Sequence, residues 1–200
     1  MRGRRIVVVV ILAVLAAGCG VADHVSLRMP KCGEDGARTT FLMAQSVPDA
    51  ALVPCIDDAS LPGDLFMEDM RIDSTGARFA FVGDWPVSDS DTAAPLRLEV
   101  RFTSSCAVGD AVAVPSDERD ARRLERVERV AAGYAGERFY LFDGGCVTYR
   151  FDAQGDAWLS FVHEASQTWT FMPRTEVERL RDVALGACGE GSAANVPCDR

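Results

Sequence analysis

The stretch Leu96-Arg97-Leu98-Glu99-Val100-Arg101-Phe102 alternates apolar and charged residues without a fault. A period of two is typical of a β-strand, in which successive side chains point to opposite faces of the sheet. We therefore expect one face of this strand to be buried and the other to meet solvent or to pair its charges. It is the clearest strand in the sequence, and the other elements are predicted outward from it.

A β-hairpin is predicted on the N-terminal side of this strand. Residues 65–73 and 77–83 flank Ser74-Thr75-Gly76, a sequence typical of a tight turn. The apolar residues available for one face of the hairpin are Phe66, Met70, Ile72, Phe79 and Phe81. Together with residues 96–102, this hairpin would form an antiparallel meander.

A helix is predicted over residues 116–133. Ser116 can cap its start, and the acidic residues of the first turn suit the helix dipole. The apolar residues that recur at helical spacing are Ala121, Leu124, Val127 and Ala131. Glutamates also precede arginines by four residues, in the pairs Glu118–Arg122 and Glu125–Arg129. The arginines are therefore interpreted as a solvated, charge-paired helix face and not as a patch that binds polyanions.

A second hairpin and three further elements are predicted after Gly133. Residues 138–142 and 147–151 are aromatic and β-branched, and Asp143-Gly144-Gly145 between them suits a tight turn. Residues 156–165 can form a short helix and residues 168–172 a strand. The capping box Thr175-x-x-Glu178 would then open a last helix, which reaches Leu185.

These elements predict an α+β fold, an antiparallel sheet with helices packed on one face. Residues 96–185 match the element order of a ferredoxin-like split β-α-β unit, here preceded by a β-hairpin. In that topology the first and third strands are antiparallel neighbours. The end of the first strand would then lie beside the start of the third, which brings Cys106 close to Cys146.

The N-terminus is interpreted as a processing signal. Three arginines precede the apolar run 6–17, which at ~12 residues is too short to span a bilayer that needs ~20. Leu15-Ala16-Ala17-Gly18-Cys19 resembles a bacterial lipobox, in which the cysteine thiol receives diacylglycerol and the freed amine is acylated. We expect residues 1–18 to be removed, residues 19–37 to form a lipidated tether that starts at Cys19, and residues 38–200 to form one domain. Cleavage elsewhere, as in an ordinary signal peptide, stays an alternative, and the export route stays open.

The mature chain is decidedly acidic. Removal of residues 1–18 takes away three arginines and no acidic residue, so the formal net charge changes from −9 to −12. An acidic surface repels nucleic acid and anionic lipid headgroups, so neither is expected as a direct partner. The expected location is extracytoplasmic, on the cell membrane through the lipid of Cys19, with another envelope protein as a candidate partner and no small-molecule ligand specified.

The remaining cysteines predict three disulfides. Apart from Cys19 they are Cys32, Cys55, Cys106, Cys146, Cys188 and Cys198, an even number in an oxidising compartment. Pairing of nearest neighbours in the sequence gives the bonds 32–55, 106–146 and 188–198. A thiolate metal site is not expected, because the sequence contains no Cys-x-x-Cys motif and neither His24 nor His163 belongs to a Cys/His cluster.

Three runs of the mature chain carry a family resemblance. They are Leu42-Met43-Ala44-Gln45-Ser46-Val47-Pro48, Val53-Pro54-Cys55 and Phe142-Asp143-Gly144-Gly145-Cys146-Val147-Thr148-Tyr149-Arg150-Phe151. They resemble runs in uncharacterised actinobacterial envelope proteins, and the resemblance covers most of the mature chain. It implies a single exported module and no activity, ligand or catalytic residue.

No residue is assigned a catalytic, cofactor-binding or metal-binding role. His163 and Glu164 could form a base and its partner, but adjacent helical residues point about 100° apart. Residues 152–156 lack most ligands of a calcium loop, and the acidic loop with Asp84, Asp89 and Asp91 is interpreted as solvated. The sequence also contains no Gly-x-Ser-x-Gly or Ser-x-x-Lys motif.

Two functions from different classes remain. The preferred one is a lipid-anchored binding or interaction module of the bacterial cell envelope, because an anchor and disulfides account for the informative residues without a reaction. The alternative is a secreted hydrolase with an unrecognised site built on carboxylates or on His163. Such an enzyme would need a concave pocket with perturbed carboxylates or His163 at its base.

Overall fold

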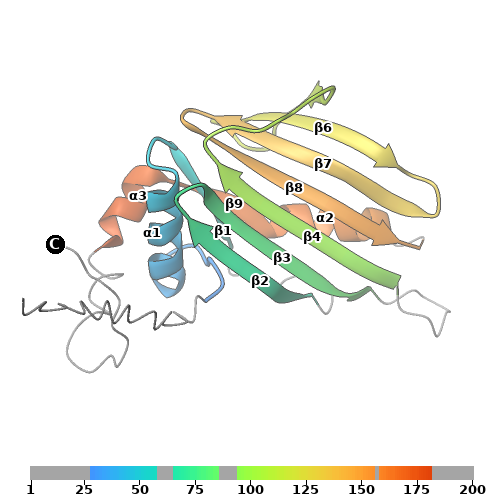
Figure 1. Cartoon of the computed structure of the whole chain (residues 1–200), viewed down its shortest axis with the longest axis horizontal. Coiled ribbons are helices and arrows are strands. Elements are labelled where there is room, and N and C mark those ends of the chain that lie inside the picture. Colours follow the sequence, from blue (N-terminus) through green and yellow to red (C-terminus); the bar gives the residue numbers. More distant parts are fainter. Residues whose placement is uncertain (1–27, 58–64, 86–93, 156–157, 182–200) are drawn as a thin grey trace, which may run out of the picture.

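A seven-stranded antiparallel sheet organises the computed structural model (Figure 1). The structure describes residues 28–57, 65–85, 94–155 and 158–181. The strand order of the sheet is β2-β3-β4-β8-β7-β6-β5. The strands are β2 Phe66–Asp73, β3 Gly76–Trp85, β4 Ala94–Thr103, β5 Val112–Val114, β6 Arg122–Arg129, β7 Gly133–Phe142 and β8 Gly145–Gln154.

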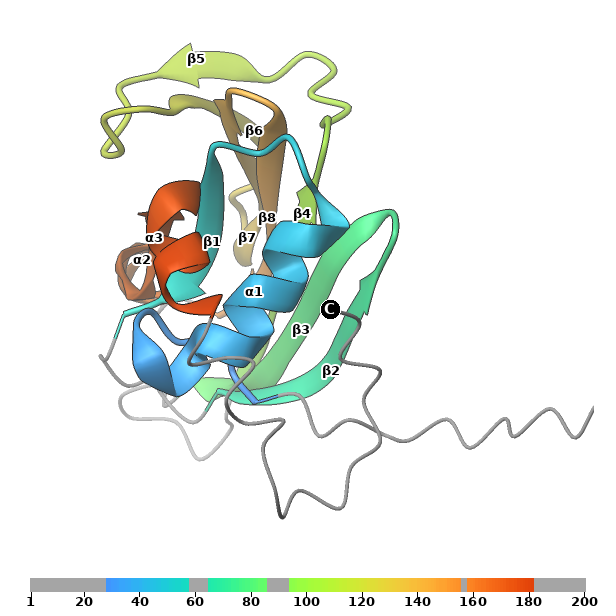
Figure 2. The ribbon, with the colours of Figure 1, turned by 90° about the vertical axis from the view of Figure 1, so that its left-hand side faces the viewer.

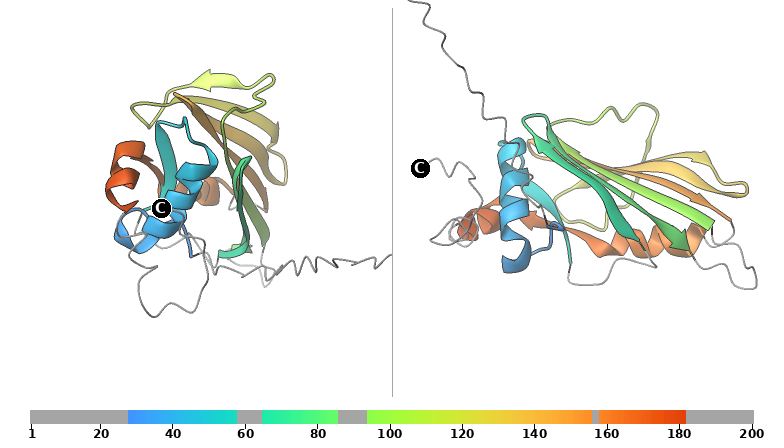
Figure 3. Two further views of the ribbon diagram at one scale, coloured as in Figure 1. Left: turned by 60° about the vertical axis from the view of Figure 1, so that its left-hand side comes forward. Right: turned by 60° about the horizontal axis from the view of Figure 1, so that its bottom comes forward.

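A second layer lies against one face of the sheet. It contains a two-stranded ribbon, β1 Leu52–Ile56 with β9 Trp169–Pro173, and the short 3-10 helix Glu34–Gly36. Its helices are α1 Ala37–Ser46, α2 Trp158–Thr168 and α3 Arg174–Arg179. Figure 2 shows the sheet curving around this layer, and the right-hand view of Figure 3 shows the helices on one side of it. We call the sheet face toward this layer the inner face and the opposite one the outer face. The α+β prediction with a β-hairpin is confirmed.

The alternation of residues 96–102 has the predicted consequence. Leu96, Leu98, Val100 and Phe102 of β4 are all at most 4 % exposed on the inner face. Glu99 of the outer face accepts a hydrogen bond from Arg101 at 2.5 Å and forms an ion pair with Arg78 at 3.0 Å. β4 can hold the middle of the sheet, between β3 and β8, because one of its faces is apolar and the other pairs its charges.

The ribbon closes the aromatic core. Trp169 of β9 packs its ring near Phe79 and Phe81 of β3 and near Tyr149 of β8, with ring centroids 5.8–5.9 Å apart. Arg174, which follows β9 directly, donates to the carbonyls of Ala44 and Val47 at 3.1 Å. These carbonyls belong to the C-terminal end of α1, so the arginine satisfies groups that a helix end leaves unpaired.

Both predicted hairpins and the predicted strand neighbours are present. β2 pairs with β3, β7 pairs with β8, and β4 pairs with β8 so that Thr103 lies opposite Cys146. The disulfides Cys32–Cys55 and Cys106–Cys146 are formed as predicted. The third predicted bond, Cys188–Cys198, lies outside the described residues, as do the signal, Cys19 and His24.

The predicted helix over residues 116–133 is wrong. This segment contains β6, which pairs with β5 on one side and β7 on the other. Ala132 and Gly133 have φ values of 56° and 138°, so a turn separates β6 from β7 where the helix was expected to end. The segment forms a strand although its apolar residues have helical spacing. Its charged residues pair with partners on a neighbouring strand, and the segment alone does not reveal these partners.

The ferredoxin-like unit is not confirmed. Its predicted crossover helix is strand β6, and its predicted fourth strand, β9, pairs with β1 instead of joining the main sheet. The predicted capping box is also wrong, because α3 begins at Arg174 and places Thr175 inside the helix, without a side-chain cap. The helix ends at Arg179, short of the predicted end at Leu185, which lies outside the described residues.

The folded part begins before the predicted boundary at residue 38. Lys31 forms a bridge with Ile56, Cys32 is bonded to Cys55, and the Thr39 hydroxyl donates to the carbonyl of Arg28 at 2.9 Å. Residues 28–37 therefore contact the domain and are not part of a free tether. Within the ranges that the structure describes, no helix is both long and apolar enough to cross a membrane.

The connection between β4 and β5 crosses the outer face of the sheet. Cys106 is bonded to Cys146 of β8, and Asp110 lies 3.7 Å from the Arg126 guanidinium of β6. Leu124 and Phe139 are 8 % and 2 % exposed on this same face. The disulfide thus fixes the segment that carries the chain over β8 and β7 to the far edge.

Replacement of Cys106 and Cys146 by serine is expected to lower the free energy of unfolding by roughly 3–4 kcal/mol, because the bond closes a 40-residue loop. Urea unfolding followed by circular dichroism measures this loss. Amide hydrogen exchange should become faster in residues 104–114. The matched control, Cys32→Ser with Cys55→Ser, should leave exchange in that segment unchanged, and identical exchange patterns in the two variants would contradict this role.

Candidate functional site

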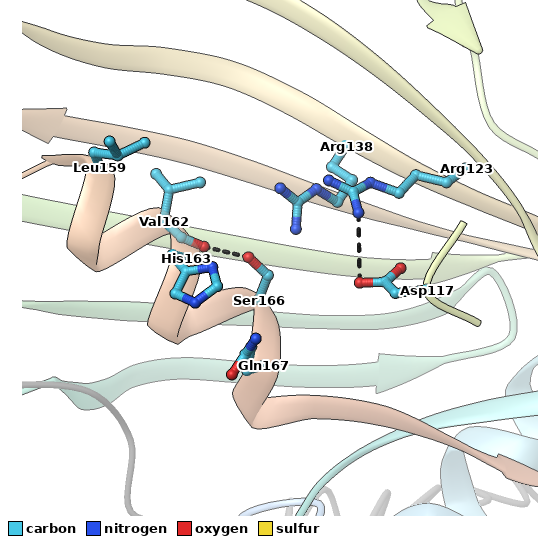
Figure 4. Close-up of a pocket in the computed structure, with 8 residues that line it drawn as sticks. All are labelled: Asp117, Arg123, Arg138, Leu159, Val162, His163, Ser166 and Gln167. Atoms are coloured by element: carbon cyan, nitrogen blue, oxygen red, sulfur yellow. Dashed lines mark hydrogen bonds and ion pairs between the residues drawn. The ribbon is translucent and has the colours of Figure 1, made fainter. Parts of the chain in front are cut away.

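A cleft lies between helix α2 and the β6–β7 end of the inner face. Its volume is about 280 Å³. The residues that line it, drawn in Figure 4, are Asp117, Arg123, Arg138, Leu159, Val162, His163, Ser166 and Gln167. One wall is therefore formed by β6, β7 and Asp117 of the loop before β6. The other wall is one side of helix α2.

The sheet wall is charged because of the register between β6 and β7. Arg123 and Glu125 are two residues apart on β6, so both face inward, and Glu125 lies opposite Arg138 of β7. Glu125 Oε1 accepts from Arg138 Nε at 2.7 Å and from Arg123 at 2.5 Å. A single carboxylate thus holds two guanidinium groups on the inner face.

Arg138 is the most buried cation of this wall. Its side chain is 10 % exposed, and its guanidinium carbon lies 5.7 Å from the centre of the Phe151 ring. The Nε–H is used by Glu125, whereas the two terminal nitrogens have no hydrogen-bond acceptor among the described residues. Figure 4 shows the guanidinium groups of Arg138 and Arg123 facing α2 across the cleft. Arg138 therefore presents unused donors to the cleft from a nearly buried position.

The helical wall follows from the spacing of α2. Leu159, Val162, His163 and Ser166 recur three or four residues apart, which places them on one side of the helix. Val162 is 6 % exposed, whereas Leu159 is 65 % exposed and stands at the mouth. This wall offers an apolar surface opposite the two arginines.

Tyrosines lie behind the charged wall. The Tyr140 hydroxyl donates to Asp117 Oδ1 at 2.8 Å, and burial together with this hydrogen bond raises the pKa of Tyr140 well above its usual value. The Tyr149 ring meets the Tyr140 ring edge to face at 5.7 Å. The hydroxyl of Tyr149 is buried and has no hydrogen-bond partner in the described part of the chain, and burial raises its pKa as well.

The pKa values of two carboxylates in this region are shifted in opposite directions. Burial by itself raises the pKa of Glu125, but the hydrogen bond from Arg123 and the charges of both arginines outweigh it, so the pKa lies below its usual value. The pKa of Glu118 is raised, first by burial and then by the charge of Asp117. Glu125 therefore stays ionised at neutral pH and keeps both arginines in place.

His163 is the sequence candidate that reaches the cleft. Glu164 does not line it, and the hydroxyl of Ser166 donates to the carbonyl of Val162, within its own helix, and not to His163. Asp152 is in β8 and pairs with Arg129 at 2.8 Å. The side chains of Asp84, Asp89 and Asp91 lie outside the described residues, and within the described ranges no three His, Cys, Asp or Glu side chains are grouped to hold a metal.

Sequence reasoning missed the residues of the sheet wall. Arg123 and Glu125 were placed on a helix, where they would not share a face with residues of the second hairpin. The segment gives no clear strand signal, because its apolar residues Leu124, Val127 and Val130 recur every third position and not every second.

Comparisons with known proteins returned no match to a protein-family model, to a curated protein or to a solved structure. The case for a function therefore rests on the geometry of the cleft.

Two tyrosine substitutions should change stability in opposite directions. Tyr149→Phe removes a buried hydroxyl without a partner and should raise the free energy of unfolding by about 1 kcal/mol. Tyr140→Phe removes the hydrogen bond to Asp117 and should lower it by about 1 kcal/mol. Denaturant unfolding of both variants measures the difference, and destabilisation of equal size in the two would show that Tyr149 also has a hydrogen-bonding role.

Proposed function

We propose that this chain is a lipid-anchored binding module of the bacterial cell envelope and that the cleft beside α2 is its ligand site. The observation that carries the proposal is the guanidinium of Arg138, nearly buried and held by Glu125, with its terminal nitrogens turned to the cleft. A buried cation with unused donors is costly unless a partner satisfies it. A bound ligand would supply that partner.

The form of the cleft supports binding of a small molecule. Ligand sites of proteins are concave and mostly apolar, with a few polar groups that fix orientation, and they occupy roughly 300–1,000 Å³. The volume of about 280 Å³ lies just below this range, which suits a small ligand. The arginines provide orientation, and Leu159 with Val162 provides apolar contact.

A hydrolase has less support. A nucleophile needs a base within hydrogen-bonding reach, but the Ser166 hydroxyl is engaged by Val162. His163 is exposed at the edge of the cleft, whereas the most buried polar side chain of the lining is that of Arg138, a cation that binds anions and cannot act as a base. These groups support binding over hydrolysis.

The anchor belongs to the same proposal. Eight residues lie between Cys19 and Arg28, where the described part of the domain begins, and the nine steps from one to the other reach at most about 32 Å when extended. A lipid on Cys19 would therefore keep the start of the described domain close to the membrane surface. The bond between Cys32 and Cys55 would transmit this restraint directly to β1.

Native mass spectrometry of the chain extracted from membranes in mild detergent tests both parts of the proposal. The variants are Ser166→Trp, which fills the cleft, and Ser160→Trp, an exposed position of the same helix outside the cleft lining. We expect covalent lipid on residues 19–200 of every form, except in a Cys19→Ala control. We also expect a non-covalent adduct in the wild type and Ser160→Trp that Ser166→Trp loses.

Two results would count against the proposal. A mature chain without lipid would contradict the anchor. Identical adducts, or none, in the wild type and Ser166→Trp would contradict the cleft as the ligand site.

A further inference from the structure

We infer that the cleft takes a small organic acid with one carboxylate and an apolar body, bound through the terminal nitrogens of Arg138. This inference rests on the proposed function and names the class of its ligand. It follows from the donors of Arg138, the charge balance of the sheet wall and the apolar side of α2.

The free donors of Arg138 match a carboxylate. Because Nε is bonded to Glu125 at 2.7 Å, the guanidinium cannot turn freely, and its two terminal nitrogens stay directed to the cleft. Two nitrogens on one planar group form a fork that suits the two oxygens of a carboxylate. The Phe151 ring, 5.7 Å from the guanidinium carbon, supports the group from another side.

The charge balance favours a single negative charge. Arg123 already has two acidic partners, since it donates to Glu125 at 2.5 Å and its guanidinium lies 3.4 Å from Asp117. Glu125 also accepts from Arg138, so two arginines meet two carboxylates before any ligand binds. A monocarboxylate can bond to Arg138 with little added repulsion, whereas a phosphate dianion would bring a second charge toward Asp117 and Glu125.

The apolar side of α2 accounts for the rest of the ligand. Leu159 is 65 % exposed at the mouth, and Val162 lies deeper in the same wall. These side chains face the arginines across the cleft, as Figure 4 shows, so a ligand bound to Arg138 would lay its hydrocarbon part on them. The volume of about 280 Å³ limits this part to a short chain or a single ring.

The test uses four probes that separate charge from hydrocarbon. They are hexanoate, hexanol, acetate and hexyl phosphate at pH 7.5, each titrated into the membrane-extracted mature chain in detergent and followed by ¹⁵N–¹H NMR. We expect hexanoate to shift the backbone amides of Leu159 and Ser166. Each of the other three probes should bind at least about tenfold more weakly, because it lacks the charge, lacks the hydrocarbon or carries an extra charge.

The variants assign the effect to Arg138. Arg138→Lys keeps the charge but not the fork and should weaken hexanoate binding by about 10- to 100-fold. The matched control Arg150→Gln changes an exposed arginine of β8 and should leave the affinity unchanged. Because detergent partitioning of hexanoate is the same for both variants, the difference between them reports the cleft alone.

A second pair keeps the test valid if Arg138→Lys unfolds. Leu159 is mostly exposed, so Leu159→Asp and Leu159→Asn should both fold. Leu159→Asp should weaken hexanoate more than Leu159→Asn does, because it also repels the carboxylate. Equal losses in the two variants would overturn the inference.

Failure of the inference differs from failure of the proposed function. If hexanol binds as tightly as hexanoate, or hexyl phosphate binds more tightly, the class of ligand is wrong and the cleft remains a site. If no probe shifts the amides while Ser166→Trp still loses its native adduct, the inference again fails alone. If the adduct is absent as well, both fail.

Discussion

The carboxylate of Glu125 allows two arginines to lie on the inner face of this sheet. Glu125 accepts from Arg123 on its own strand and from Arg138 on the neighbouring strand, so two cations can lie on a face that is otherwise apolar. Loss of one partner from such a buried set leaves the other charges uncompensated, at a cost of about 3–5 kcal/mol. The same bond through Nε directs the remaining nitrogens of Arg138 to the cleft. Stability of the β6–β7 wall and the geometry of the site therefore depend on a single interaction.

The second layer covers the inner face unevenly, and this creates the site. Over β3, β4 and β8 the ribbon β1–β9 brings Trp169 onto a set of aromatic and aliphatic residues, which forms the core. Over β7 the ribbon contributes Phe171, whose ring lies 5.2 Å from that of Tyr140, and a cleft remains between one side of α2 and the β6–β7 wall. Tyr149 lies at the junction. Its ring packs in the aromatic core, and burial, with the nearby charges of Tyr140 and Glu118, raises the pKa of its hydroxyl. Core and site are thus neighbouring regions of one face.

Local patterns predicted the parts of this fold that depend on neighbouring residues in the chain. The period of two at residues 96–102, the turns at Gly76 and Gly144, and two disulfides between sequence neighbours all followed from composition and spacing. The apolar residues of the segment 121–131 recur every three or four positions, which indicates a helix and not a strand. The strand is decided by the partner strand β7, whose Arg138 meets Glu125. Because the cleft is built from that pairing, His163 could be named from the sequence whereas Arg123 and Arg138 could not.

The central claim is that Glu125 holds the Arg138 Nε–H in a buried hydrogen bond, and arginine side-chain NMR tests it most directly. In a ¹⁵N-labelled chain, the Nε–H of Arg138 should be among the arginine Nε–H protons that exchange most slowly with water. Glu125→Gln removes the charge of the acceptor and should bring its exchange much closer to that of the exposed Arg150. Similar exchange rates for the Nε–H protons of Arg138 and Arg150 in the wild type, or unchanged exchange of Arg138 in Glu125→Gln, would contradict this hydrogen bond.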